Sequence, residues 1–239
     1  MTQDPRLSQE RKLGNVAVFT LGLSPPIVSE FLLKLRERGI EVSKAIAVTT
    51  SGSMFSFYIL KIAFWWSGKP PRDLEERLWI GDFSQVELKC QMLTMEDIAS
   101  IHDCVSYRKQ FSGALRNGLK FAGNDPSKVH VCVAGGRKTM PVDGVIASMA
   151  KGITNVYHVI APEIPGISQE FASRIKEDEK LREELKRFAE DLENTPDHLK
   201  EYALKVCFPP KPFEVHLVKY PLPKLSEGER KTLAKLLLL

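Results

Sequence analysis

Three short segments of the sequence combine small, hydroxyl-bearing and basic residues in a pattern that suits an anionic ligand. They are Gly22, Leu23 and Ser24; Thr49, Thr50, Ser51 and Gly52; and Gly135, Gly136, Arg137, Lys138 and Thr139. Glycines let a backbone approach a ligand closely, and guanidinium and ammonium groups form charge-assisted hydrogen bonds with phosphate. We therefore predict that these segments bind a phosphate-bearing ligand when the fold brings them together.

The same residues do not form the better-known phosphate, nucleophile or metal motifs. Residues 136–139 resemble the end of a P-loop, but Arg137 separates the glycine from Lys138, and the upstream glycine of that motif is missing. No GxGxxG run is present, and Ser24 is followed by two prolines, unlike the serine of a GxSxG elbow. The five histidines show no metal-ligand spacing. We predict neither a metal nor a cofactor.

Predicted strands and helices alternate over residues 15–162. Short apolar runs predict strands over residues 15–21, 44–50, 85–93, 129–133 and 156–160. Apolar residues at helical spacing predict helices from Ser24, as the N-terminal cap, to Gly39, and over residues 54–66, 95–121 (with a bend near Gly113) and about 142–151. Each candidate segment follows a strand, and the first and third open a helix, where free N–H groups attract phosphate.

The remainder of the chain is richer in charge and predicts helices before one last strand. Residues 168–192 predict an amphipathic helix, a short helix follows Pro196, residues 213–219 alternate like an edge strand, and residues 221–239 predict a terminal helix. The predicted fold is α/β: a Rossmann-like, mostly parallel sheet with helices on both faces and a C-terminal helical insertion. We expect one domain over residues 1–239, with a core at about 15–162, an insertion at about 163–210 and a closing strand and terminal helix at about 211–239.

Composition restricts the class of protein more than its chemistry. The 239 residues carry 34 Lys and Arg against 30 Asp and Glu, a formal net charge of +4, which permits an anionic ligand without indicating a DNA-binding tail. The four cysteines are widely spaced, which predicts reduced thiols. No apolar run is long enough to span a membrane, and the N-terminus lacks a signal-peptide pattern. We expect a cytoplasmic protein that does not bind membranes or DNA.

Two of the candidate segments resemble signatures of CRISPR-associated Rossmann-fold (CARF) domains. Residues 21–30, Leu-Gly-Leu-Ser-Pro-Pro-Ile-Val-Ser-Glu, resemble the Gly-x-Ser-Pro segment after the first strand of these domains. Residues 135–140, Gly-Gly-Arg-Lys-Thr-Met, resemble their second signature, which follows a later strand. The resemblance covers residues 15–162 and extends more loosely to residues 213–221. With no sign of an appended nuclease or DNA-binding domain, the chain looks most like the stand-alone ring nucleases of type III CRISPR systems.

The resemblance implies a homodimer that binds cyclic tetra-adenylate where two pockets meet on a two-fold axis. Such enzymes cut the ring without metal into linear di-adenylates that end in a 2′,3′-cyclic phosphate. By the same resemblance, Ser24 orients the ribose or scissile phosphate, and Lys138 stabilises charge on that phosphate. The ring is expected to contact Arg137, Gly22, Leu23, Gly135 and Gly136, together with Thr50, Ser51, Gly52 and Thr139. Because the nucleophile is the ring's own 2′-hydroxyl, the site needs geometry and positive charge more than a strong base.

Two departures from the family pattern keep other hypotheses open. Leu23 stands where many relatives carry a small or hydroxylated residue, and Pro141 removes an N–H donor from a helix start. The alternative is a non-catalytic cyclic-oligoadenylate sensor of a CRISPR effector or regulator, with residues 168–205 as its output surface. An RNA-cutting effector is disfavoured because residues 163–239 offer only His198 and His216 as bases. A DNA-binding regulator is disfavoured because the charges of that region are mixed in sign.

Overall fold

The protein is described by a computed structural model over residues 14–162, 167–211 and 214–236. The strands are β1 (Asn15–Thr20), β2 (Val42–Thr50), β3 (Glu87–Leu93), β4 (Val129–Cys132), β5 (Val156–Ile160) and β6 (His216–Lys219). The helices are α1 (Pro26–Glu37), α2 (Met54–Trp66), α3 (Arg72–Arg77), α4 (Ile101–Phe121), α5 (Thr139–Ala150), α6 (Ile167–Glu177), α7 (Glu179–Glu190), α8 (Asp197–Cys207) and α9 (Glu227–Leu236). Short 3-10 turns lie at Ser51–Ser53 and Pro126–Lys128.

The strands form one sheet in the order β3-β2-β1-β4-β5-β6. Neighbouring strands from β3 to β5 are parallel, and β6 is antiparallel to β5, with Tyr157 opposite Lys219. The central strands are apolar runs buried on both faces, as parallel strands covered by helices require. The predicted α/β, mostly parallel fold with helices on both faces and a C-terminal helical insertion is confirmed.

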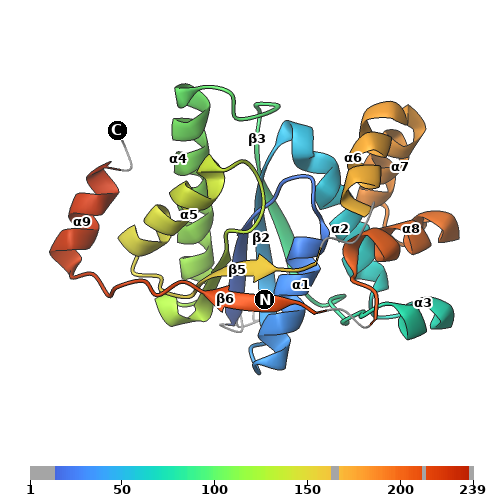
Figure 1. Cartoon of the computed structure of the whole chain (residues 1–239), viewed down its shortest axis with the longest axis horizontal. Coiled ribbons are helices and arrows are strands. Elements are labelled where there is room, and N and C mark those ends of the chain that lie inside the picture. Colours follow the sequence, from blue (N-terminus) through green and yellow to red (C-terminus); the bar gives the residue numbers. More distant parts are fainter. Residues whose placement is uncertain (1–13, 163–166, 212–213, 237–239) are drawn as a thin grey trace, which may run out of the picture.

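Alternate residues of β1 point into two separate hydrophobic cores. Ala17 and Phe19 pack with residues of α1, α2 and α8, whereas Val16 and Val18 pack with residues of α4 and α5. Figure 1 shows the same division, with α4 and α5 on one side of the sheet and α1, α2 and α8 on the other. The sheet is therefore the middle layer of three, and α9 adds a further contact on α5.

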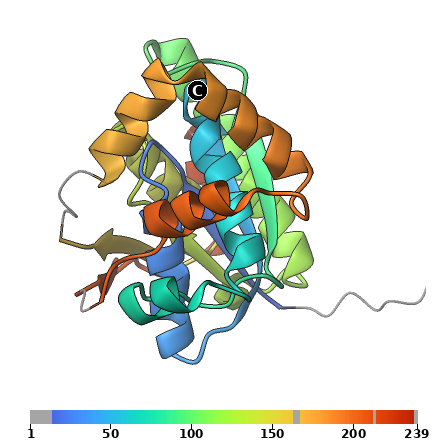
Figure 2. The same ribbon diagram turned by 90° about the vertical axis from the view of Figure 1, so that its right-hand side faces the viewer.

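The helical insertion packs beside α2, and its helix boundaries differ from those predicted. In Figure 2, α8 crosses the front of the molecule with α3 below it and α6 and α7 above it. The single helix predicted over residues 168–192 is wrong, because α6 ends at Glu177 and α7 begins at Glu179. Asp178 between them has an extended backbone, and its side chain accepts a hydrogen bond from the Leu181 N–H at 2.9 Å, so it caps a new helix.

Three helix starts also differ from prediction. Helix α1 begins at Pro26 with Pro25 in the capping position, so Ser24 is not its cap; Pro25 already has helical backbone angles, and its carbonyl accepts from the Val28 N–H at 3.1 Å. Helix α4 is continuous and begins six residues later than predicted, at a capping box made by Ser100 and Asp103. Helix α5 begins earlier than predicted, at Thr139.

The last strand and the terminal helix lie where they were predicted, but both begin later than predicted. Strand β6 closes the sheet as predicted but begins at His216, while Phe213 lies outside the described residues. Terminal helix α9 begins at Glu227 and not at residue 221, and residues 237–239 are likewise outside them. Helix α3 was not predicted, because its six residues are too few to show helical periodicity. In the described part of the chain, no helix is long and apolar enough to cross a membrane.

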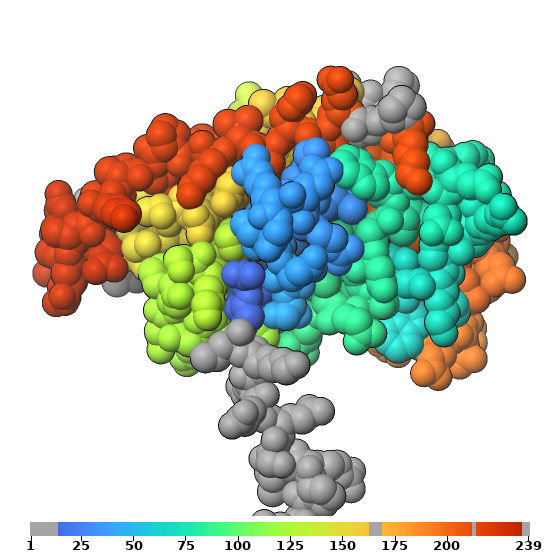
Figure 3. All heavy atoms as spheres, turned by 90° about the horizontal axis from the view of Figure 1, so that it is seen from below, coloured from blue at the N-terminus to red at the C-terminus, as the bar shows by residue number. Residues whose placement is uncertain are grey.

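The two ends of the sheet, where the parallel strands finish and where they begin, present different segments to solvent. Below, each of these ends is called an edge. The parallel strands all run the same way, so α1, α4 and α5 follow the end of the sheet where those strands finish, and the first turn of α4 lies at the top of Figure 1. Figure 3 shows the opposite edge, where the turn after α1 lies between residues near the end of α4 and residues near α3. The segments predicted to bind a ligand all belong to the first of these edges.

Candidate functional site

The sheet reverses its direction of winding between β1 and β4. From β1 the chain proceeds to β2 and β3 on one side, and from β4 it proceeds to β5 on the other. The connections that leave the neighbouring strands β1 and β4 therefore diverge to opposite faces of the sheet, and we refer to the place between them, at the carboxyl ends of these strands, as the crevice. In open α/β sheets, this is where ligands bind. The segments that follow these two strands are residues 21–25 and 133–138, which contain Ser24 and Lys138.

Glycines allow the two segments to touch through their backbones. A Cβ placed on Gly22 would lie 2.9 Å from both the Cα and the N of Gly136, closer than real Cβ atoms approach other atoms. Gly136 has a φ of +86°, which strains any residue with a side chain. A Cβ on Gly135 would lie 2.4 Å from the carbonyl oxygen of Thr20. The predicted segments are thus joined at a contact that only glycines permit.

A buried threonine fastens this contact. The Thr20 hydroxyl donates a hydrogen bond to the Gly135 carbonyl at 2.7 Å and accepts one from the Gly135 N–H at 3.2 Å. Thr20 is fully buried at the end of β1, so both polar partners are shielded from water. Thr20 was not among the predicted site residues, although a hydroxyl at the end of an apolar strand is a signal that the sequence contains.

The basic and hydroxyl residues of the second segment are on the surface of the crevice. Arg137, Lys138 and Thr139 are exposed, and Lys138 occupies the capping position of α5. The adjacent Met140 is buried, and its sulfur accepts a hydrogen bond from the Arg137 N–H at 3.1 Å. On the first segment, Leu23 is 37% exposed and Ser24 is partly buried. The arrangement offers two positively charged side chains beside two helix starts, which suits an anion.

A family model described as CRISPR-associated protein NE0113 matches residues 24–237. The chain belongs to this family. The match covers nearly all of the sequence, including Ser24, the Gly135–Thr139 segment and the helical insertion. No curated protein matches the sequence. The protein is therefore a CRISPR-associated protein of the NE0113 family.

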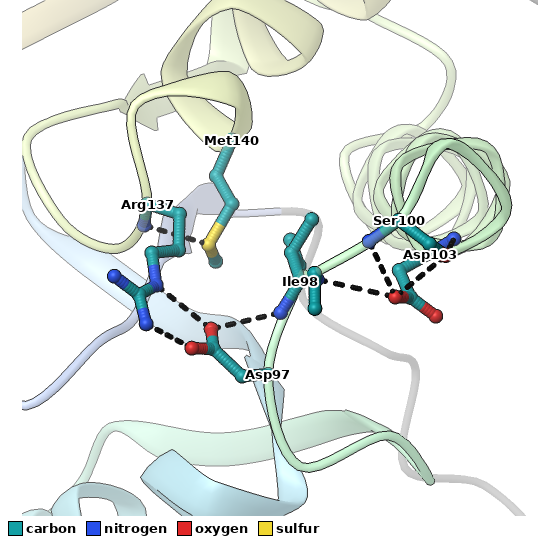
Figure 4. Close-up of polar contacts among 7 residues, drawn as sticks. Asp97, Ile98, Ser100, Asp103, Arg137 and Met140 are labelled. Atoms are coloured by element: carbon teal, nitrogen blue, oxygen red, sulfur yellow. Dashed lines mark hydrogen bonds and ion pairs between the residues drawn. The ribbon is translucent and has the colours of Figure 1, made fainter.

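In this NE0113-family protein, Arg137 is paired with an aspartate that sequence analysis did not identify. The Arg137 Nε donates to Asp97 Oδ1 at 2.8 Å, and its Nη2 donates to Oδ2, so both carboxylate oxygens face the guanidinium (Figure 4). The hydrogen bond from Arg137 is the main cause that lowers the pKa of Asp97. Asp97 lies on the segment between β3 and α4, forty residues from its partner in sequence, so no local pattern pointed to it.

The predicted ligand residues after β2 hold that same segment. The Ser51 N–H donates to the Met95 carbonyl at 3.0 Å, and the Gly52 N–H donates to the Glu96 carbonyl at 3.2 Å. Thr50, at the end of β2, is only 5% exposed. The backbone N–H groups of Ser51 and Gly52 are therefore occupied by these carbonyls. Contact between a ligand and Thr50, Ser51 or Gly52 through their remaining backbone or side-chain atoms stays a prediction.

One carboxyl group near the start of α1 is buried without a charged neighbour that lowers its pKa. Glu30 is 3% exposed, and desolvation raises the pKa of its side chain to about 7. This glutamate belongs to the signature at residues 21–30, but no role was predicted for it. Burial raises the pKa of the Cys132 thiol at the end of β4, and nearby Glu30 raises it further. Glu30 therefore contributes a proton-sensitive group beneath the crevice.

Three of the five histidines are part of the sheet. His130, His158 and His216 are in strands, as predicted, and burial lowers the pKa of His130 to about 4. Within the described ranges, no group of three or more His, Cys, Asp or Glu side chains is placed to hold a metal ion. The groups that this family member offers at the crevice are basic and hydroxyl side chains, backbone, and the carboxyl groups of Asp97 and Glu30.

Proposed function

We propose that this CRISPR-associated protein is a metal-independent ring nuclease that binds cyclic tetra-adenylate. The single observation that supports it is the junction of the two signature segments, with Gly22 against Gly136 at the point where the sheet reverses its winding. The junction sets Ser24, at the start of α1, and Lys138, at the start of α5, on neighbouring connections of one crevice. The protein would act in the cytoplasm and end type III CRISPR signalling by destroying its messenger.

The proposed reaction uses the substrate's own nucleophile. A ribose 2′-oxygen attacks the adjacent phosphorus, the bond to the 5′-oxygen breaks, and a 2′,3′-cyclic phosphate and a 5′-hydroxyl result. The 2′-hydroxyl loses its proton to solvent, and the leaving 5′-oxygen takes one from solvent. Lys138 would stabilise the charge that builds on the phosphate oxygens, and Ser24 would orient the reacting ribose or phosphate. Cleavage at two opposite positions gives two linear di-adenylates.

The proposed binding unit is a homodimer of CARF domains. A ring of four identical nucleotides has two-fold symmetry, so two copies of one pocket related by a two-fold axis match it better than one pocket alone. Each copy would supply Arg137 and Lys138 to the ring phosphates, and the glycines of both segments would let the backbone approach it. Thr139, at the first position of α5, would contact the ring from the same helix start.

Product analysis tests the proposal directly. Purified protein in excess is mixed with radiolabelled cyclic tetra-adenylate in the presence of EDTA, and the products are separated. We expect linear di-adenylate with a cyclic phosphate end. Rings that stay intact and unbound, with cyclic hexa-adenylate behaving in the same way, would contradict the assignment of ligand.

The alternative is a non-catalytic sensor, and one feature favours it. Pro141 lies in the first turn of α5, where it removes one of the N–H groups that a helix start offers to an anion. In the same experiment, tight binding with an intact ring would support the sensor, and attention would move to α6, α7 and α8 as its output surface.

A further inference from the structure

We infer that Asp97 is a positioning residue, which orients the guanidinium of Arg137 so that its second edge faces a phosphate of the ligand. The inference rests on the proposed function, because it concerns how the same crevice recognises an anionic ring. It adds to the site a residue, Asp97, that neither signature segment contains.

The geometry of the pair leaves one edge of the arginine available. A guanidinium has five N–H donors in a planar fork, and two edges of that fork can each bind an anion through two hydrogen bonds. Asp97 occupies the Nε/Nη2 edge. The remaining nitrogen, Nη1, points away from the carboxylate in Figure 4. A phosphate can therefore bind at the Nη1/Nη2 edge while Asp97 holds the other.

The aspartate itself is on a supported segment. Backbone hydrogen bonds from Ser51 and Gly52 hold the carbonyls of Met95 and Glu96, and the Ile98 N–H donates to Asp97 Oδ1 at 2.8 Å. A Cβ on Gly52 would lie 2.4 Å from the Glu96 carbonyl oxygen, so the two segments pack with no spare room. Asp97 is thus fixed from two sides, as a residue that orients another must be.

The Arg137–Asp97 ion pair is too exposed to contribute much to the stability of the fold. The side chains of Arg137 and Asp97 are 65% and 42% exposed. Solvent screens exposed pairs of this kind, so they contribute little to folding. Loss of Asp97 should therefore leave the melting temperature nearly unchanged, while the arginine side chain gains rotational freedom that binding must then remove. This difference separates a positioning role from a structural one.

The test is a double-mutant cycle on cyclic tetra-adenylate binding. We expect Asp97→Asn to weaken binding by about tenfold, Arg137→Ala to weaken it by at least as much, and Asp97→Asn to add nothing in the Arg137→Ala background. Glu96→Gln is the matched control, because it removes one negative charge from the neighbouring exposed residue. Glu96→Gln should leave the dissociation constant within about twofold of that of the wild type. Any change should be a slight decrease, because the substitution removes a negative charge that repels the anionic ligand.

Several outcomes would overturn the inference. Tighter binding by Asp97→Asn would mean that the carboxylate competes with the ligand for Arg137. An unchanged effect in the Arg137→Ala background would mean that Asp97 does not act through the arginine. A second measurement needs no ligand: NMR of the Arg137 Nε–H should give a slowly exchanging signal that Asp97→Asn abolishes. If wild-type protein binds no ring, the proposed function fails, and an Nε–H signal that the substitution leaves unchanged would refute the positioning role separately.

Discussion

At the scale of single residues, residue type beside glycines was enough to propose the charged members of the candidate site, whereas their hydrogen-bond partners became visible only in the structure. Arg137, Lys138 and Ser24 were recognised because basic and hydroxyl groups beside glycines suit a phosphate ligand. Asp97 was not predicted because its partner, Arg137, lies forty residues away. The hydroxyl of Thr20 at the end of an apolar strand was a local signal, but its partner, Gly135, lies 115 residues away. No local pattern in the sequence records such a partner.

Substitution of the two proposed catalytic residues should affect rate and binding differently. Lys138→Ala is expected to lower single-turnover cleavage of cyclic tetra-adenylate by about tenfold or more, because the charge that develops on the phosphate loses its counterion. Ser24→Ala should reduce the rate more than the affinity if it orients the reacting ribose. Rapid-quench and equilibrium-binding measurements check both, and unchanged cleavage by Lys138→Ala would remove that lysine from the reaction.

Glu30 should make stability depend on pH. Its pKa is raised from 4.5 to about 7 in the folded protein, so the fold holds this proton more tightly than the unfolded chain. The associated stabilisation is complete below about pH 4.5 and is lost as pH rises through about 7. Glu30→Gln should therefore raise the free energy of unfolding at pH 8 by up to about 3 kcal/mol, and much less at pH 4.5. Urea titrations at the two pH values measure this.

A control variant separates this effect from general charge removal. Glu183→Gln changes an exposed glutamate of α7 and should alter stability little at either pH. An equal gain for Glu30→Gln at both pH values would show that its burial does not shift its titration.

At the scale of elements, periodicity located the strands and helices, while their ends depended on contacts that periodicity does not contain. The predicted start of α4 at residue 95 was wrong because Met95 and Glu96 carbonyls accept hydrogen bonds from Ser51 and Gly52. The break at Asp178 was missed because the apolar spacing continues through it, although Asp is a common helix cap. Local capping and long-range backbone bonds therefore decided the boundaries.

The junction of the two signature segments should be intolerant of a single methyl group. Gly22→Ala would place a Cβ 2.9 Å from the Gly136 backbone, which must then move. We expect a loss of about 1–3 kcal/mol in unfolding free energy and weaker ring binding. Gly228→Ala is the matched control, because a Cβ there meets nothing within 4 Å and α9 gains helix propensity. Thermal and chemical unfolding compare the two, and equal stabilities would argue against a tight junction.

At the scale of the whole molecule, the sequence predicted an α/β sheet but not the order of its strands. The site depends on that order, because β1 and β4 are neighbours although more than a hundred residues of chain separate them. The predicted segments after β1 and after β4 lie in contact at Gly22 and Gly136, and only the sheet order explains why they meet, while ligand binding by them stays a prediction. The alternation of strands and helices along the chain fits several such orders.

If two copies bind one ring, the stoichiometry must show it. Calorimetric titration of the protein with cyclic tetra-adenylate should give about one ring for every two chains, since a two-fold symmetric ligand fills both pockets at once. Light scattering of the complex should give about twice the 26.9 kDa of one chain. A complex of one ring with one chain would refute the shared pocket.

The pairing of β5 with β6 has a consequence for the order of folding. Strand β6 pairs with β5, with Val159 opposite Leu217. Because α6, α7 and α8 lie between these strands in the chain, all three helices are synthesised before β6 can join the sheet. Until then the outer edge of β5 carries unpaired backbone groups, which attract other strands. Such distant pairing forms slowly, because a long loop must close first. We therefore expect the edge of β5 to be able to pair with a neighbouring chain until β6 has joined the sheet.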